Sequence, residues 1–216
     1  MRGEARVAPF AAGNARIALA PIRFRAEPDG TTRIETGMVL SGPFNDGYVR
    51  DLALRIVGRV GNGGFTLGEE CTPASFRSLQ AAELVLGRTN LALCPTGRAL
   101  VWKQGDGPLR GGARVERPLL VGRLGRNPIR ISADSLRFDI DDPGFASSGV
   151  KVRLGAGEGA HWLDIGAISG DFDAPGVGGT FANASGKLSA VPILLSDAEG
   201  QWRVVDGDLT IEGATT

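Results

Sequence analysis

The chain holds two cysteines, Cys71 and Cys94, and these are the residues with the clearest capacity for chemistry. They stand 23 positions apart. The chain has no CxxC motif and no second pair of metal ligands, so a zinc site has little support. Two interpretations remain open: small buried thiols in a reducing compartment, or a disulfide in an oxidising one. A disulfide closing a loop of this length would stabilise the fold by roughly 3 kcal/mol.

The other residues that could do chemistry lack the partners it requires. His161 is the only histidine, and the chain has no GxSxG, HExxH or Walker-type motif. Residues 155–160 match GxGxxA, but strand-like alternation resumes directly after them, where a dinucleotide site needs a helix. The carboxylates of residues 138–142 lack the glycine and distal glutamate of an EF-hand loop and suit a turn. We therefore predict no enzyme activity, no catalytic residues, no metal site and no cofactor.

The composition predicts a folded, turn-rich chain. Among 216 residues, 42% are hydrophobic, 33 are glycine and 12 are proline, without a collagen-like period. Lys and Arg together number 24, as do Asp and Glu together, so the net charge is zero. Nucleic acid is therefore an unfavoured partner. No stretch of about 18 apolar residues is present to cross a membrane as a helix, and the N-terminus lacks the apolar region of a signal peptide.

Apolar residues recur at every second position along the whole chain, for example at Leu52, Leu54 and Ile56. This period places them on one face of a β-strand. Clusters of Gly, Asp, Asn and Pro separate the alternating runs, as at 27–30, 45–47, 62–64, 141–144, 197–200 and 206–207. The pattern predicts an all-β fold of about a dozen antiparallel strands joined by hairpin turns, forming a single unit over residues 1–216.

The segment between the cysteines is ambiguous. Thr72 and Pro73 could begin a helix that ends at Gly87, with residues 73–86 presenting one apolar face. Alternation at Leu84 and Leu86, and again at Leu91 and Leu93, favours two hairpin strands over 76–86 and 89–94, with the turn at 87–90. Such a hairpin would return Cys94 toward Cys71.

Two stretches resemble a known family. CTPASFRSLQAAELVLGRTNLALCP (residues 71–95) and VPILLSDAEGQWRVVDGDLTIEG (191–213) are similar to segments of YdbH-like proteins, which belong to the AsmA and TamB group of bacterial bridge-like lipid transfer proteins. The resemblance covers 48 of the 216 residues. The region between the two stretches shares with the family only the alternation of strands and turns. These motifs are structural rather than catalytic.

The resemblance implies an internal segment of a periplasmic protein that is anchored in the inner membrane elsewhere in its chain. It implies an elongated antiparallel sheet curled into an apolar, β-taco-like groove that carries phospholipid toward the outer membrane. The implied partners are phospholipid acyl chains and a small outer-membrane lipoprotein added as a further strand. An oxidising periplasm also favours a disulfide between Cys71 and Cys94.

A sheet with one apolar face must cover it with protein or with ligand. If lipid covers it, the alternating apolar residues are the candidates for the groove. These are Leu84, Leu86, Leu91, Leu93, Ile129, Ile131, Leu136, Phe138, Ile140, Val152, Leu154, Ile193, Leu209 and Ile211. The alternative function is structural or adhesive, in a module that is secreted or displayed on the cell surface. Such a module would be a β-solenoid or a β-sandwich, and its Gly- and Asx-rich turns would resemble those of this sequence.

Overall fold

A computed structural model describes residues 1–44, 47–157, 160–172, 176–188, 193–205 and 208–214. The protein is all-β, as predicted, and no α-helix lies among the described residues. Every registered strand pair among them is antiparallel. None of the described elements is a helix that could cross a membrane. The chain divides into two compact units, residues 1–114 (unit 1) and 115–216 (unit 2).

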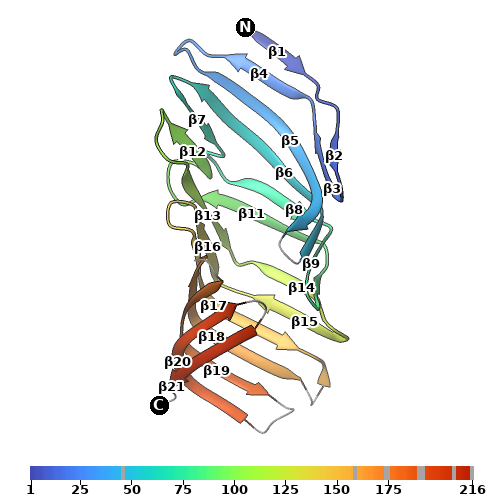
Figure 1. Cartoon of the computed structure of the whole chain (residues 1–216), viewed down its shortest axis with the longest axis vertical. Coiled ribbons are helices and arrows are strands. Elements are labelled where there is room, and N and C mark those ends of the chain that lie inside the picture. Colours follow the sequence, from blue (N-terminus) through green and yellow to red (C-terminus); the bar gives the residue numbers. More distant parts are fainter. Residues whose placement is uncertain (45–46, 158–159, 173–175, 189–192, 206–207, 215–216) are drawn as a thin grey trace. The chain divides into compact units, whose positions relative to one another are not determined.

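Unit 1 is organised around two long strands, β5 (Thr32–Phe44) and β6 (Gly47–Gly61), which pair along most of their length (Figure 1). β3 and β4 pair with β5, and β1 pairs with β4, while β7, β8 and β9 pair with β6. The remaining strands of unit 1 are β1 (Arg2–Ala5), β2 (Phe10–Ala12), β3 (Ala15–Leu19), β4 (Ile22–Ala26), β7 (Gly64–Leu67), β8 (Thr72–Phe76), β9 (Ser78–Ala81), β10 (Leu84–Leu86), β11 (Thr89–Pro95), β12 (Val101–Gln104) and β13 (Arg110–Glu116), the last of which runs across the boundary.

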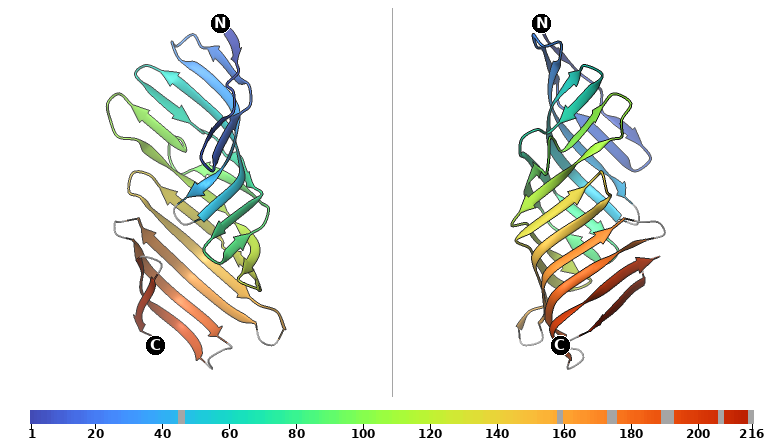
Figure 2. Two further views of the ribbon diagram at one scale, coloured as in Figure 1. Left: turned by 45° about the vertical axis from the view of Figure 1, so that its right-hand side comes forward. Right: turned by 90° about the vertical axis from the view of Figure 1, so that its left-hand side faces the viewer.

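Unit 2 is a meander of long neighbouring strands. β17 (Gly144–Leu154), β18 (His161–Asp171), β19 (Val177–Leu188), β20 (Ile193–Val205) and β21 (Asp208–Ala214) pair in sequence order. Figure 2 shows β17, β18 and β19, in orange, side by side from two further directions. Two shorter strands, β15 (Asn127–Ser132) and β16 (Ser135–Asp139), both pair with β17, and β14 (Leu119–Leu124) pairs with β15.

The described residues form 21 strands, more than the dozen that the turn pattern predicts. The difference arises because several extended stretches are interrupted without reversing direction. β8 and β9 both pair with β6 in one continuous register, and β15 and β16 do the same along β17. The predicted turn at 197–200 is wrong for the same reason: these residues lie inside β20, and Asp197 adopts a left-handed φ of 45° without turning the chain.

The segment 73–86 is extended, so the helix alternative is wrong. The hairpin is also longer than expected, because its turn lies at Ala82 and Glu83 and not at 87–90. Ala82 has a φ of 47°, which a tight hairpin turn requires. One register joins β9 with β10 and β8 with β11, from Leu84 opposite Ala81 to Leu93 opposite Thr72.

The other turns follow the sequence signals. Asn62 and Gly63 join β6 to β7 with φ values of 53° and 71°, as a type I′ hairpin turn demands. Residues 140–143 join β16 to β17, and the GxGxxA segment at 155–160 joins β17 to β18 as a hairpin connection. Within that segment residues 158–159 lie outside the described residues, as do 45–46 and 206–207 of two further predicted turns.

Candidate functional site

The apolar alternation of unit 1 places one continuous set of aliphatic side chains on one face of its sheet. Directly opposed residues of antiparallel strands share a face. Met38 lies opposite Leu54, Leu54 lies opposite Ala74, and Ala74 lies opposite Leu91. This face, which we call the apolar face of unit 1, therefore extends over β5, β6, β8 and β11. Leu93, two pairs further along β11, belongs to it as well.

A β-bulge at Asp51 keeps this face continuous where the alternation changes phase. Leu40 lies opposite Leu52, but Gly42 lies opposite Val49, so β6 has one residue more than β5 at this point. Asp51 has a left-handed φ of 51°, and its N–H donates to Ser41 Oγ at 2.8 Å. Leu52, Leu54 and Ile56 on one side of Asp51 therefore share the face with Val49 on the other side, although their numbers differ in parity.

The bulge brings the predicted residues of β10 onto the same face as those of β11. Val49 lies opposite Leu79, and Leu79 lies opposite Leu86. Leu84 follows at the next alternate position of β10. The structure therefore places Leu84, Leu86, Leu91 and Leu93 together, although the first two and the last two differ in phase along the sequence.

The disulfide between Cys71 and Cys94 is present, as predicted. The register of β8 with β11 puts Leu93 opposite Thr72, so the next pair outward is Cys94 with Cys71, and their Cα atoms are 4.0 Å apart. At Cys94 and Pro95, β11 pairs instead with β13, where these residues lie opposite Arg114 and Ala113. The bridge therefore fastens the hairpin at the end where its hydrogen-bonded ladder stops.

Unit 2 carries a corresponding apolar face. Ile129 lies opposite Leu154 and Ile131 lies opposite Val152, so these four predicted residues of β15 and β17 share a face. The same face continues to Leu163 on β18, which lies opposite Val152. Ile129 is buried, whereas the other four are only half-buried.

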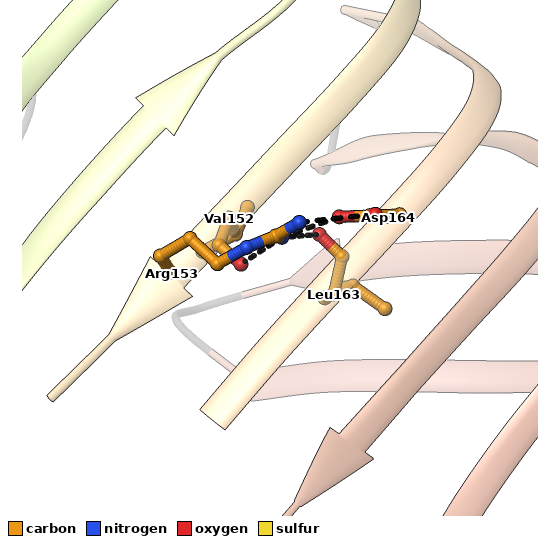
Figure 3. Close-up of polar contacts among 4 residues, drawn as sticks. All are labelled: Val152, Arg153, Leu163 and Asp164. Carbon is orange, nitrogen blue, oxygen red and sulfur yellow. Dashed lines mark hydrogen bonds and ion pairs between the residues drawn. The ribbon is translucent and has the colours of Figure 1, made fainter. Parts of the chain in front are cut away.

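The opposite face of this part of unit 2 is charged. Arg130 lies opposite Arg153, and Lys151 lies opposite Asp164. Figure 3 shows Arg153 reaching diagonally from β17 to Asp164 on β18. Its Nη2 donates to Asp164 Oδ2 at 3.0 Å, and its Nη1 donates to Oδ1 and to the backbone oxygen of Val152. This bidentate pair raises the pKa of Arg153, mainly through the hydrogen bonds to the carboxylate.

The remaining predicted groove residues of unit 2 are more exposed or lie elsewhere. Leu136 and Phe138 lie on β16 opposite Ser147 and Phe145 of β17. Leu209 and Ile211 lie on β21, which pairs only with β20 among the described strands, and they are 61% and 60% exposed. Two further predicted residues stand apart: Ile140 lies in the turn after β16, and Ile193 begins β20 with a side chain outside the described residues.

An aromatic cluster on unit 2 is a feature that the alternation does not single out. The ring centroid of Phe145 on β17 lies 6.0 Å from the ring centroid of Phe172 and 5.9 Å from that of Trp202 on β20. Trp202 Nε1 donates to the backbone oxygen of Ser169 at 3.0 Å. Two glycines lie between the rings, Gly170 on β18 and Gly179 on β19. They are the sequence signal for this cluster, but only the strand register shows that they lie between Phe145 and Trp202.

Within each unit, the described residues provide no second layer over the apolar face. Strands make their substantial contacts with their hydrogen-bonded neighbours. A two-layer domain of this size would enclose a large core. The buried hydrophobic residues among those described are few and mostly small: Val49, Ala74, Phe76, Leu86, Ala99, Val115, Ile129, Ala184 and Ala198.

The described residues include no group of three or more His, Cys, Asp or Glu side chains arranged to hold a metal ion. Asp139, one of the carboxylates of 138–142, instead accepts a hydrogen bond from Arg137 Nε at 2.8 Å. No protein-family model, curated protein sequence or solved structure matches this chain.

Proposed function

We propose that the apolar faces of the two units bind the acyl chains of phospholipid, and that the chain is a segment of a non-enzymatic lipid conduit. The observation that carries the proposal is a single layer of sheet with one aliphatic, half-exposed face and one charged face. Water in contact with such a face costs free energy, which aliphatic ligands recover at about 0.8 kcal/mol for each buried CH₂ group.

The chemistry of the face suits acyl chains better than a compact polar ligand. Most side chains that line it, such as Leu91, Ile131 and Val152, offer only dispersion contacts, and the hydroxyls of Thr36 and Thr72 on this face donate to backbone oxygens. A ligand held in this way needs no specific headgroup pocket, so it can move along the face. The resemblance to YdbH-like proteins supports the same function and, with it, a periplasmic location between the inner and outer membranes.

The alternative, a structural or adhesive module, has less support. A parallel β-solenoid stacks its strands in parallel, whereas the registered strands here pair antiparallel. A β-sandwich packs the inner faces of two sheets into a core about 10 Å thick. Only nine hydrophobic residues are buried among those described, which is few for such a core.

Site-specific photo-crosslinking tests the proposal. A photoreactive residue at Leu91 should capture phospholipid in cells, and one at its strand neighbour Ala92 should not, because neighbouring residues of a strand face opposite sides. Ile131 and Arg130 form a second such pair on β15. Native mass spectrometry of the gently extracted protein should show bound phospholipid. Equal capture at Leu91 and Ala92, together with a lipid-free mass, would contradict lipid binding by this face.

A second test uses a buried charge. Ile131→Asp places a carboxylate on the apolar face, where desolvation without a partner is costly, so lipid retention should fall. Arg130→Asp changes the charge more strongly but on the opposite face, and should leave retention unchanged. Circular dichroism of both variants separates loss of binding from loss of fold.

A further inference from the structure

The zero net charge of the chain conceals a division between its units. Unit 1 contains 15 Lys and Arg against 10 Asp and Glu, a net charge of +5. Unit 2 contains 9 against 14, a net charge of −5. A chain divided in this way can present a strongly basic surface that its overall composition does not reveal.

Four arginines on four neighbouring strands form a row across the charged face of unit 1. Arg2 on β1 lies opposite Arg25 on β4, which lies opposite Arg33 on β5, which lies opposite Arg59 on β6. Adjacent strands are about 4.8 Å apart, so the row places four like charges within about 15 Å on one face. Like charges directly opposite one another destabilise a sheet. The arrangement therefore calls for negative charge from outside the row.

The protein's own carboxylates neutralise only part of this row. Arg25 Nε lies 3.7 Å from Glu27 Oε1, and Arg59 Nη1 lies 2.6 Å from Glu69 Oε2. Arg2 and Arg33 make no ion pair with any described residue, and both are exposed. Arg2, Arg25 and Arg33 also line an open hollow of about 610 Å³, together with Arg23 and two glutamates. This hollow is accessible to an anionic group.

An aromatic residue continues the row toward the other edge of the face. Arg59 lies opposite Thr66 on β7, Thr66 opposite Trp102 on β12, and Trp102 opposite Arg110 on β13. The guanidinium of Arg110 lies 5.7 Å from the Trp102 ring centroid, and that of Arg98 lies 5.4 Å away. Tryptophan flanked by arginine is typical of surfaces that lie at the headgroup level of a bilayer. Inorganic polyphosphate, which has no apolar surface, would give the tryptophan no such role.

We propose that this arginine row, Arg2, Arg25, Arg33 and Arg59, docks unit 1 on a membrane surface that contains anionic phospholipid. Guanidinium groups bind phosphate oxygens in bidentate geometry, and the row offers them at regular spacing. The row lies on the face opposite to the apolar face, so docking is a separate activity from acyl-chain binding. It does not depend on the conduit function.

Vesicle co-flotation of the whole 216-residue chain tests the proposal. The protein should bind phosphatidylcholine vesicles that contain phosphatidylglycerol and should not bind vesicles of phosphatidylcholine alone. Binding should be lost at about 1 M salt, where the Debye length is about 3 Å. Arg2→Gln with Arg33→Gln should reduce the partition coefficient about 30-fold, which corresponds to about 1 kcal/mol per arginine. These two arginines are chosen because their removal leaves no carboxylate without its partner.

The matched control removes the same charge from unit 2. Arg123→Gln with Arg130→Gln should bind as the unchanged protein does, and Arg2→Lys with Arg33→Lys should retain most of the binding. Thermal unfolding should show that Arg2→Gln with Arg33→Gln remains folded, since the change relieves repulsion. Equal binding to both kinds of vesicle, an equal fall in the unit 2 control, or binding of inorganic polyphosphate without binding of vesicles would each overturn the proposal.

Discussion

The rings of Phe145 and Trp202 lie 5.9 Å apart although two strands separate their backbones. Phe145 lies opposite Gly170 on β18, Gly170 lies opposite Gly179 on β19, and Gly179 lies opposite Trp202. The two glycines leave the surface between the aromatic residues bare, so that the rings meet above it. A Cβ atom at Gly170 would lie 2.6 Å from Trp202 Cζ2 and 2.7 Å from Phe145 Cε1.

Gly170→Ala should therefore destabilise unit 2. The added methyl group forces the aromatic rings out of position, and overpacking of this kind costs about 1–3 kcal/mol. Gly178→Ala is the matched control, because the nearest atom to its Cβ would be Trp202 O at an ordinary 3.4 Å. Denaturant unfolding followed by tryptophan fluorescence measures both. Equal stability of the two variants would show that the aromatic contact does not depend on Gly170.

Removal of the disulfide should lower the free energy of unfolding by roughly 3 kcal/mol, the amount that the closed loop between Cys71 and Cys94 predicts. The loss should appear on reduction of the native protein and in the variant Cys71→Ser with Cys94→Ser. Reducing agent should have no further effect on that variant, which makes it the control. A native protein whose unfolding midpoint is unchanged by reduction would contradict a stabilising role for the bridge.

Asp51 should tolerate glycine but not a β-branched residue. Its left-handed φ of 51° is strained for valine, and a residue held in such a conformation costs about 1–3 kcal/mol. Asp51→Gly should be close to neutral, and Asp51→Val should destabilise unit 1 by about 2 kcal/mol. Urea unfolding compares the two. A valine variant as stable as the glycine variant would show that the bulge can be absorbed by a shift of register.

Glu35 should report on its ion pair with Arg55. Hydrogen bonds from the Arg55 guanidinium, at 2.5 Å and 3.2 Å, lower the pKa of Glu35, and the charge of Arg55 lowers it further. A carboxyl with a lowered pKa in the folded state stabilises the fold above its ordinary pKa and loses this contribution as the pH falls through the folded value. Arg55→Gln should raise the pKa of Glu35 toward its ordinary value of 4.5.

Side-chain carboxyl titration by NMR measures this pKa in both proteins. Arg33→Gln provides the comparison, because Arg33 makes the smallest of the contributions that lower the Glu35 pKa. Its effect should be much smaller than that of Arg55→Gln. Equal shifts in the two variants would mean that general positive charge on this face, and not the hydrogen-bonded pair, sets the pKa.

The sequence by itself determines that this protein is all-β and where most of its turns lie. Alternation with a period of two is a local property, and a turn such as Asn62 and Gly63 depends on the φ values that those two residues accept. These signals need no partner strand. The sequence likewise shows that Ile129, Ile131, Val152 and Leu154 alternate with polar residues. They share one face of the sheet once their strands pair.

Only the tertiary structure decides which strands are opposed and in what register. A single-residue slip moves every side chain of a strand to the other face, and the register depends on contacts between residues far apart in the chain. The Asp51 bulge is invisible in the local pattern for this reason, and Asp197, in a sequence that is typical of a turn, lies within β20. The arginine row likewise brings Arg2 to Arg59 through three strand pairings, and no spacing along the chain reveals it.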